Sequence, residues 1–167
     1  MNQRKRLRIC AGGVFLSDPE TDIKKEKSTR CVVAFGGNLG NADETFRAAI
    51  ADLEKAGLEI EKVSTVITTA PVGCEVGAPD FRNGVLTGFW GGSAPDLLAV
   101  CQALEEKYGR PNDHAKSVSR TLDLDLILFG DEKWDTEKLT LPHPRAKERD
   151  FVCIPLAEIA PELLSQL

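Results

Sequence analysis

One stretch, Arg120 to Phe129, constrains the fold of this chain more than any other. It alternates polar and apolar residues at first and is wholly apolar at its end, a pattern typical of a buried β-strand. Side chains alternate between the two faces of a sheet. One face is therefore predicted to carry Asp123, Asp125, Ile127 and Phe129, and the other face the leucines.

The two aspartates of this strand are expected to stand side by side, roughly 6.6 Å apart along the chain. Adjacent, partly buried carboxylates repel each other, and each is costly unless it is neutralised. Magnesium favours such hard oxygen ligands and often binds through one or two carboxylates plus substrate phosphates. Arg110 and Arg120 come before the pair and favour a polyanion held between metal and guanidinium groups. A strand whose aspartates simply face water is the alternative for this pattern taken alone.

Composition places the chain among ordinary globular proteins. Its 167 residues suffice for one domain with a full core, and 42% of them are hydrophobic. The net charge of −5 argues against non-specific binding of nucleic acid. The five cysteines are scattered and odd in number, which favours reduced thiols in the cytoplasm over a disulfide framework or a zinc site.

Targeting signals are weak. No run approaches the roughly 18 consecutive apolar residues of a transmembrane helix, so no membrane association is expected. A short apolar run, Ile9 to Leu16, follows a basic start but contains two glycines, and we do not interpret it as a signal peptide. Residues 1–29 lack sustained periodicity and predict a mobile N-terminal extension, or an extra strand at best. Residues 30–167 would form the domain.

The remaining chain predicts an α+β order. Strands are expected at 31–35, 58–69, 81–89, 120–129 and 139–141, and helices at 41–57, 93–108 and 151–159. A glycine turn, residues 36–40, follows the first strand and lacks the P-loop pattern. The main order, strand, helix, strand, strand, helix, strand, predicts a ferredoxin-like βαββαβ antiparallel sheet with helices packed on one face.

Four further features of the sequence bear on a possible binding site. Phe81 and Asn83 share a strand face, where an aromatic plate beside an amide can bind a flat heterocycle, although a core Phe beside an ordinary Asn gives the same pattern. Glu105 intrudes on the apolar stripe of its helix and either has a partner or lies at an exposed edge. His143, fixed between prolines in a basic segment, is a candidate phosphate ligand. The polar loop 110–119 could close over a site.

Several motifs together resemble one family. Arg120-Thr-Leu-Asp-Leu-Asp125, Leu139-Thr-Leu-Pro-His-Pro144, Glu148-Arg-Asp-Phe151 and Pro155-Leu-Ala-Glu-Ile-Ala-Pro161 are similar to those of the 6-hydroxymethyl-7,8-dihydropterin pyrophosphokinases of folate biosynthesis. Gly36-Gly-Asn-Leu-Gly40, Ala70-Pro-Val-Gly73 and Pro79-Asp-Phe-Arg-Asn83 resemble the earlier motifs of that family. The resemblance covers about residues 31–163.

The resemblance implies transfer of pyrophosphate from ATP to the hydroxymethyl group of a reduced pterin, with AMP as the other product. Asp123 and Asp125 would hold two magnesium ions and, with Arg110 and Arg120, form the catalytic set. The implied pterin contacts are Phe81, Asn83, Phe151, Ala70, Pro71 and Val72. The implied ATP contacts are Gln102, Glu105, Arg110, Lys116, Arg120, Leu126, Lys138, Thr140, His143 and Arg149. No nucleic acid or membrane partner is expected. The protein is expected to be a monomer or a weak homodimer in the cytoplasm.

The loop departs from the family pattern. Asn112 stands where an Arg is usual and Ser117 where a Trp is usual, and Val118-Ser119 replaces a Gly-Pro; Gly37 replaces a Ser in the glycine turn. His114 and Lys116 could substitute in part. Two alternatives therefore stay open: a non-catalytic or weakly active pterin- or nucleotide-binding module, and a ferredoxin-like RNA-binding or protein-interaction domain. The net charge and the lack of an aromatic RNP-type strand oppose the second of these.

Overall fold

A computed structural model describes residues 8–10, 13–15, 28–71, 77–109 and 119–167. Its main sheet has five strands, each antiparallel to its neighbours, in the order β4-β6-β3-β7 with β5 also pairing β6. The strands are β3 (Thr29–Gly37), β4 (Glu59–Val63), β5 (Ile67–Thr69), β6 (Phe81–Trp90) and β7 (Asp123–Phe129). This order, with one helix after β3 and one after β6, confirms the ferredoxin-like fold.

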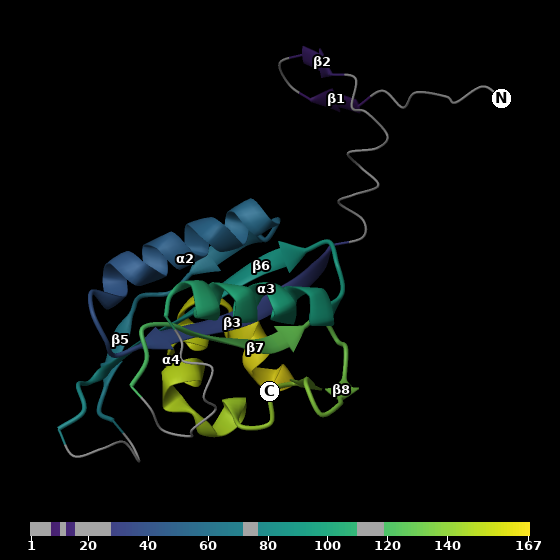
Figure 1. Cartoon of the computed structure of the whole chain (residues 1–167). Helices are drawn as coiled ribbons and strands as arrows, with labels where there is room; N and C mark the ends of the chain where they lie inside the picture. Colours follow the sequence, from purple (N-terminus) through teal and green to yellow (C-terminus); the bar gives the residue numbers. More distant parts are fainter. Residues whose placement is uncertain (1–7, 11–12, 16–27, 72–76, 110–118) are drawn as a thin grey trace.

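Those two helices begin and end as their sequences predict. In α2 (Ala42–Ala56), the Asn41 side chain accepts a hydrogen bond from the Glu44 backbone, and Gly57 ends the helix with φ 110°. In α3 (Ala94–Lys107), Ser93 and Asp96 form a reciprocal capping box. Both helices pack on the same face of the sheet, over a core that includes Phe35, Leu53 and Leu97 (Figure 1).

The opposite face is also covered, which corrects the prediction of helices on one face. There α4 (Asp150–Ile159) packs on β6, preceded by the 3₁₀ turn η1 (Ala146–Glu148) and followed by η2 (Pro161–Gln166). Val32 and Val85 from the sheet meet Val152 and Leu156 of α4 in this second core. The central strand β3 is apolar on both sides, so the fold needs a cover on each face.

Residues 58–69 form two strands where one was predicted. Ser64, between β4 and β5, is buried; its backbone N–H donates to the Val85 carbonyl and its hydroxyl accepts from the Val85 N–H, both at 2.9 Å. The serine side chain thus replaces a backbone acceptor of the sheet ladder, so the strand breaks here without leaving the Val85 N–H unpaired.

A β-bulge changes the face pattern predicted for the central strand. Val32 pairs with Leu128 but Val33 pairs with Leu126, so Ile127 is an extra residue in β7. Ile127 and Leu128 therefore both face α4, while Phe129 joins Leu124 and Leu126 in the other core. The predicted placement of Phe129 with the aspartates is wrong, because the alternation restarts after the bulge.

Two smaller sheets complete the described elements. β8 (Trp134–Asp135) pairs with β9 (Thr140–Leu141), which confirms a short strand near 139–141, and β1 (Arg8–Cys10) pairs with β2 (Gly13–Phe15). The boundary between a mobile extension and the domain near residue 29 stays a prediction. Within the described part of the chain, no helix is long and apolar enough to cross a membrane.

Candidate active site

The two aspartates of β7 each form an ion pair with an arginine. Arg120 Nη1 donates to Asp123 Oδ1 at 2.7 Å, and Arg149 Nη1 donates to Asp125 Oδ2 at 3.0 Å. Both carboxylates are partly exposed, with 28% and 35% of the side-chain surface accessible. Arg120 lies just before β7 and Arg149 just before α4, so two elements far apart in sequence supply the positive charges that balance this pair.

The donor set fits magnesium. Among the described residues no group of three or more His, Cys, Asp or Glu side chains could hold a metal ion, so the protein offers two carboxylates and not a full cage. Magnesium commonly binds in this way, with its remaining ligands supplied by water and by substrate phosphates.

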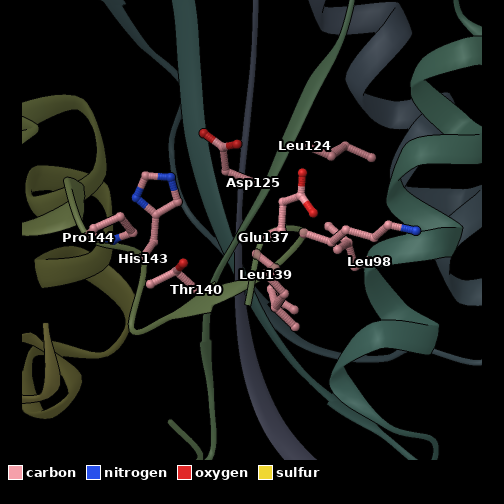
Figure 2. Close-up of a pocket in the computed structure, with 10 residues that line it drawn as sticks. Leu98, Leu124, Asp125, Glu137, Leu139, Thr140, His143 and Pro144 are labelled. Atoms are coloured by element: carbon pink, nitrogen blue, oxygen red, sulfur yellow. The ribbon is translucent and has the colours of Figure 1, made fainter. Parts of the chain in front are cut away.

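A cleft of about 280 Å³ opens beside Asp125, between α3, the middle of β7 and the segment 137–144 (Figure 2). Its lining includes five residues predicted as metal or ATP contacts: Asp125, Leu126, Lys138, Thr140 and His143. The structure adds five that the sequence reasoning did not single out: Leu98, Leu124, Glu137, Leu139 and Pro144. Leu98 and Glu137 are next in sequence to Leu97 and Lys138. Only the packing of α3 and of the β8–β9 turn against β7 brings them to the cleft.

His143 is held in place by the bulge in β7. Its backbone N–H donates to the Ile127 carbonyl at 2.9 Å, and its Nδ1 accepts from the Arg145 N–H at 3.3 Å. Burial lowers the pKa of His143 below its ordinary value, although the nearby Asp125 carboxylate acts in the opposite direction. The imidazole is therefore neutral near pH 7 with its proton on Nε2, which makes that atom a hydrogen-bond donor.

Two of the predicted pterin residues, Phe81 and Asn83, lie on β6 where it pairs with β5. Asn83 is buried, and its Nδ2 donates to the Thr69 hydroxyl at 2.8 Å. In the register of the two strands Thr69 lies opposite Phe81. Gly36 lets the amide lie against β3, since a Cβ there would stand 2.7 Å from Asn83 Oδ1. Thr69 was missed because nothing local in the sequence reveals which residue an amide across the sheet will contact.

Other predicted contacts are more dispersed. Phe151 is half-buried, and the Arg149 guanidinium lies 5.4 Å from the centre of its ring. Ala70 is exposed and Pro71 half-buried just after β5, while Gln102 is exposed on α3. Val72, Arg110 and Lys116 lie outside the described residues, as do Asn112 and Ser117.

Glu105 has the partner that its position on the apolar stripe required. Its side chain is 3% exposed and accepts a hydrogen bond from the Leu124 N–H at 2.7 Å. Leu124 lies between the two aspartates, so the Glu105 carboxylate anchors the aspartate-bearing part of β7 to α3. The alternative of an exposed stripe edge is therefore excluded.

Asn38 joins three segments at the same end of the sheet, and the sequence reasoning did not assign it a role. Its Oδ1 accepts from the Arg120 N–H at 2.8 Å, and its Nδ2 donates to Ser119 Oγ at 3.1 Å and to the Pro79 carbonyl at 3.3 Å. The glycine turn, the segment before β6 and the entry to β7 are thereby linked through one buried side chain.

The structure is thus an α+β domain whose ferredoxin-like sheet presents an aspartate pair, two arginines and a cleft beside Asp125. Comparison with known proteins gives the family. The sequence model described as 7,8-dihydro-6-hydroxymethylpterin-pyrophosphokinase (HPPK) matches residues 32–161, and the chain belongs to this family of folate-biosynthesis pyrophosphokinases.

The similar proteins differ in length. The chain is 42% identical over 132 residues to a 2-amino-4-hydroxy-6-hydroxymethyldihydropteridine pyrophosphokinase of Synechocystis sp., covering 78% of this chain and 66% of that one. It is 38% identical to the Bacillus subtilis protein of the same name, covering 78% of each. The Schizosaccharomyces pombe folic acid synthesis protein fol1 is 32% identical over 151 residues, and the match covers 90% of this chain but 20% of that protein.

Solved structures agree on the fold. A crystal structure of HPPK-DHPS in complex with substrates superposes with a TM-score of 0.61 at 12% identity, over 81% of this chain and 40% of that one. A Plasmodium falciparum HPPK-DHPS with pteroate gives a TM-score of 0.61 at 14% identity over the same shares. At these identities the likeness concerns the fold alone.

Proposed function

We propose that this protein transfers pyrophosphate from ATP to the hydroxymethyl group of 6-hydroxymethyl-7,8-dihydropterin, with magnesium, and releases AMP. The observation that carries the proposal is the position of Asp123 and Asp125, paired with two arginines at the edge of a cleft lined by the predicted nucleotide contacts. In the reaction the pterin hydroxyl oxygen attacks the β-phosphorus, and the bond from that phosphorus to the oxygen bridging the α-phosphate breaks.

The metal would be held by Asp123 and Asp125, and we propose two ions. Bound there with the triphosphate, magnesium supplies charge neutralisation and alignment of the attacking and leaving oxygens. The chain itself supplies the rest of the positive field. Arg120 and Arg149 are released from the carboxylates to the phosphates, where a guanidinium can bind two oxygens at once.

His143 and the pterin pocket provide orientation. The neutral imidazole offers its Nε2 proton to a phosphate oxygen, and it is fixed by hydrogen bonds of both its backbone and Nδ1. Thr69 fixes the Asn83 amide, which then presents its Oδ1 and its second Nδ2 hydrogen to the edge of the pterin. Phe81 and Phe151 would stack on the ring. We assign no protein group as general base.

The cellular setting is part of the same proposal. We propose that the protein acts in the cytoplasm as a monomer or weak homodimer, with ATP and the pterin as its ligands. Two described cysteines, Cys31 and Cys101, are free and fully buried, which supports a reducing compartment.

The test is pterin-dependent release of AMP from ATP and magnesium, compared with a reaction that lacks pterin. The protein with Asp125→Asn serves as the matched variant, because it keeps the shape of the side chain and loses the charge. AMP that appears only with pterin and only in the unchanged protein supports the proposal. If pterin binds, as followed by its fluorescence, and no AMP forms, the transferase assignment is wrong.

A further inference from the structure

We propose that Glu137 binds the ribose hydroxyls of the nucleotide and thereby selects ribonucleotides over deoxyribonucleotides. This inference rests on the proposed function, because it assigns one part of ATP to one part of the same cleft. The argument uses the position of Glu137, the chemistry of a carboxylate and the arrangement of the neighbouring walls.

Glu137 is held at the cleft by a tight turn. It and Lys138 are the central residues between Thr136 and Leu139, which are joined by three hydrogen bonds of 3.0 Å. The turn connects β8 to β9, and both central residues line the cleft. Figure 2 shows the Glu137 carboxylate directed into the cleft, with Asp125 and His143 to one side and Leu98 to the other.

The Glu137 side chain is exposed, so water satisfies its carboxylate in the free protein, and a ligand that displaces this water must bring a hydrogen-bond donor. An ionised Glu only accepts hydrogen bonds, and it repels the oxygens of a triphosphate. The phosphates would be drawn instead towards His143 and towards Asp125, which pairs with Arg149 and would hold the metal. Glu137 would therefore face a part of the nucleotide that carries donors.

The cleft lining also includes Leu98, Leu126 and Leu139, together with Lys138, and the leucines offer apolar surface that suits a flat base. In a nucleotide the ribose lies between base and phosphates, and its two hydroxyl groups are donors. In Figure 2 the Glu137 side chain lies between Asp125 and Leu98, which matches the order phosphate, ribose, base.

Two other roles for Glu137 fit the structure less well. As a third metal ligand it would form an acidic cluster with the aspartates, and no such group of three is present among the described residues. As a structural carboxylate it would have a partner, yet no hydrogen bond or ion pair joins its side chain to another residue in the described part of the chain. Its partner in the free protein is water, which a ligand group can replace.

The experiment measures binding of ATP, 2′-deoxy-ATP and 3′-deoxy-ATP by calorimetry, with magnesium and without pterin, so that no turnover is needed. The variants are Glu137→Ala, Glu137→Gln and the control Asp135→Asn, an exposed acid in the same hairpin that does not line the cleft. Thermal unfolding of each variant reports whether the hairpin is intact.

We expect the unchanged protein and Asp135→Asn to bind ATP about tenfold more tightly than at least one deoxy analogue, the value of one charge-assisted hydrogen bond. Glu137→Ala should bind all three equally, and Glu137→Gln, which keeps an acceptor oxygen, should fall between. Equal binding of the three nucleotides by the unchanged protein overturns the inference, even if AMP release succeeds. So does discrimination that survives in Glu137→Ala. If the preference for ATP over a deoxy analogue is lost in Glu137→Ala, but the unchanged protein forms no AMP in the transfer assay, the inference about Glu137 stands and the proposed transfer reaction is wrong.

Discussion

Asp123 and Asp125 are each neutralised by an arginine, at 2.7 and 3.0 Å respectively. Under the proposed function the same carboxylate oxygens would hold the metal, and the arginines would turn to the phosphates. Such partly exposed ion pairs contribute little to stability, about 0–1 kcal/mol each. The aspartates therefore matter for activity far more than for folding.

Replacing either aspartate by asparagine should abolish pterin-dependent AMP release, by more than about 100-fold, because a metal ligand is lost. The thermal midpoint should shift by only a few degrees, since each ion pair is weak. Turnover and melting curves of Asp123→Asn and Asp125→Asn provide the measurement. Turnover that survives in either variant would contradict the metal assignment.

Gly37 is a second residue whose importance comes from its surroundings. It takes a position where the family usually has serine, but a Cβ at residue 37 would clash with the Thr121 carbonyl oxygen. The glycine turn lies against the entry to β7, where Asn38 also bonds to Arg120. The absent side chain is what permits this close approach.

Gly37→Ser should therefore destabilise the protein by about 1–3 kcal/mol, the range for an overpacked site, and should reduce turnover by moving Arg120. Urea unfolding of this variant is compared with that of Gly91→Ser, where an added Cβ meets nothing within 4 Å. Equal urea midpoints for the two variants would mean that the glycine turn can move away from β7 at little cost. That result would contradict the importance of the close approach at Gly37.

At the scale of elements, one carboxylate joins the two helices of the ferredoxin-like unit. Asp52 of α2 accepts hydrogen bonds from Lys107 Nζ at 2.6 Å and from the Tyr108 hydroxyl at 2.9 Å, at the end of α3, and from Lys55 Nζ at 3.1 Å. These hydrogen bonds lower the pKa of Asp52 well below its ordinary value. The link therefore depends on the charge of one side chain.

The pH dependence of stability follows from the lowered pKa of Asp52. A carboxyl with a lowered pKa in the folded state contributes stability above its unfolded pKa, near 3.9, and loses that contribution as pH falls towards the folded pKa. Asp52→Asn should thus lower the urea midpoint at pH 7 and have a smaller effect at pH 2.5. Glu54→Gln, an exposed neighbour on α2, is the control. An effect of Asp52→Asn that is the same at both pH values would contradict the ionic link.

At the scale of the whole molecule, the sheet separates two cores. One lies under α2 and α3 and the other under α4 and η2. Both faces must be covered at once, because β3 places Val33 and Phe35 on one side and Val32 and Ala34 on the other. Cys31 and Cys101 lie in the first core, and burial raises the pKa of each thiol to about 12.

These two thiols should report global unfolding. At pH 8 they are protonated and inaccessible, so a maleimide should modify them only when the whole domain opens, while the partly exposed Cys153 reacts earlier. Mass spectrometry of peptides after timed labelling, with and without urea, provides the measurement. Labelling of Cys31 or Cys101 as fast as Cys153 in native buffer would show that the first core opens locally.

How much of the structure can be predicted from the sequence depends on how far apart along the chain the interacting residues lie. Asn41, Gly57 and the Ser93–Asp96 box act within a few residues of themselves, so the helix limits were predictable. The alternation of β7 and the motifs around it identified the aspartate pair and the family. The sequence by itself thus determined the main order of elements and the fold class, while the roles of the predicted site residues stay predictions.

Tertiary structure decided what depends on contacts across the chain. The bulge at Ile127, which sends Phe129 to the other face and anchors His143, follows from pairing with β3. The cover of α4 on the second face, the bond of Thr69 to Asn83 and the entry of Glu137 into the cleft likewise join distant segments. Local patterns encode periodicity and caps, whereas register and packing are set only when the strands and helices meet.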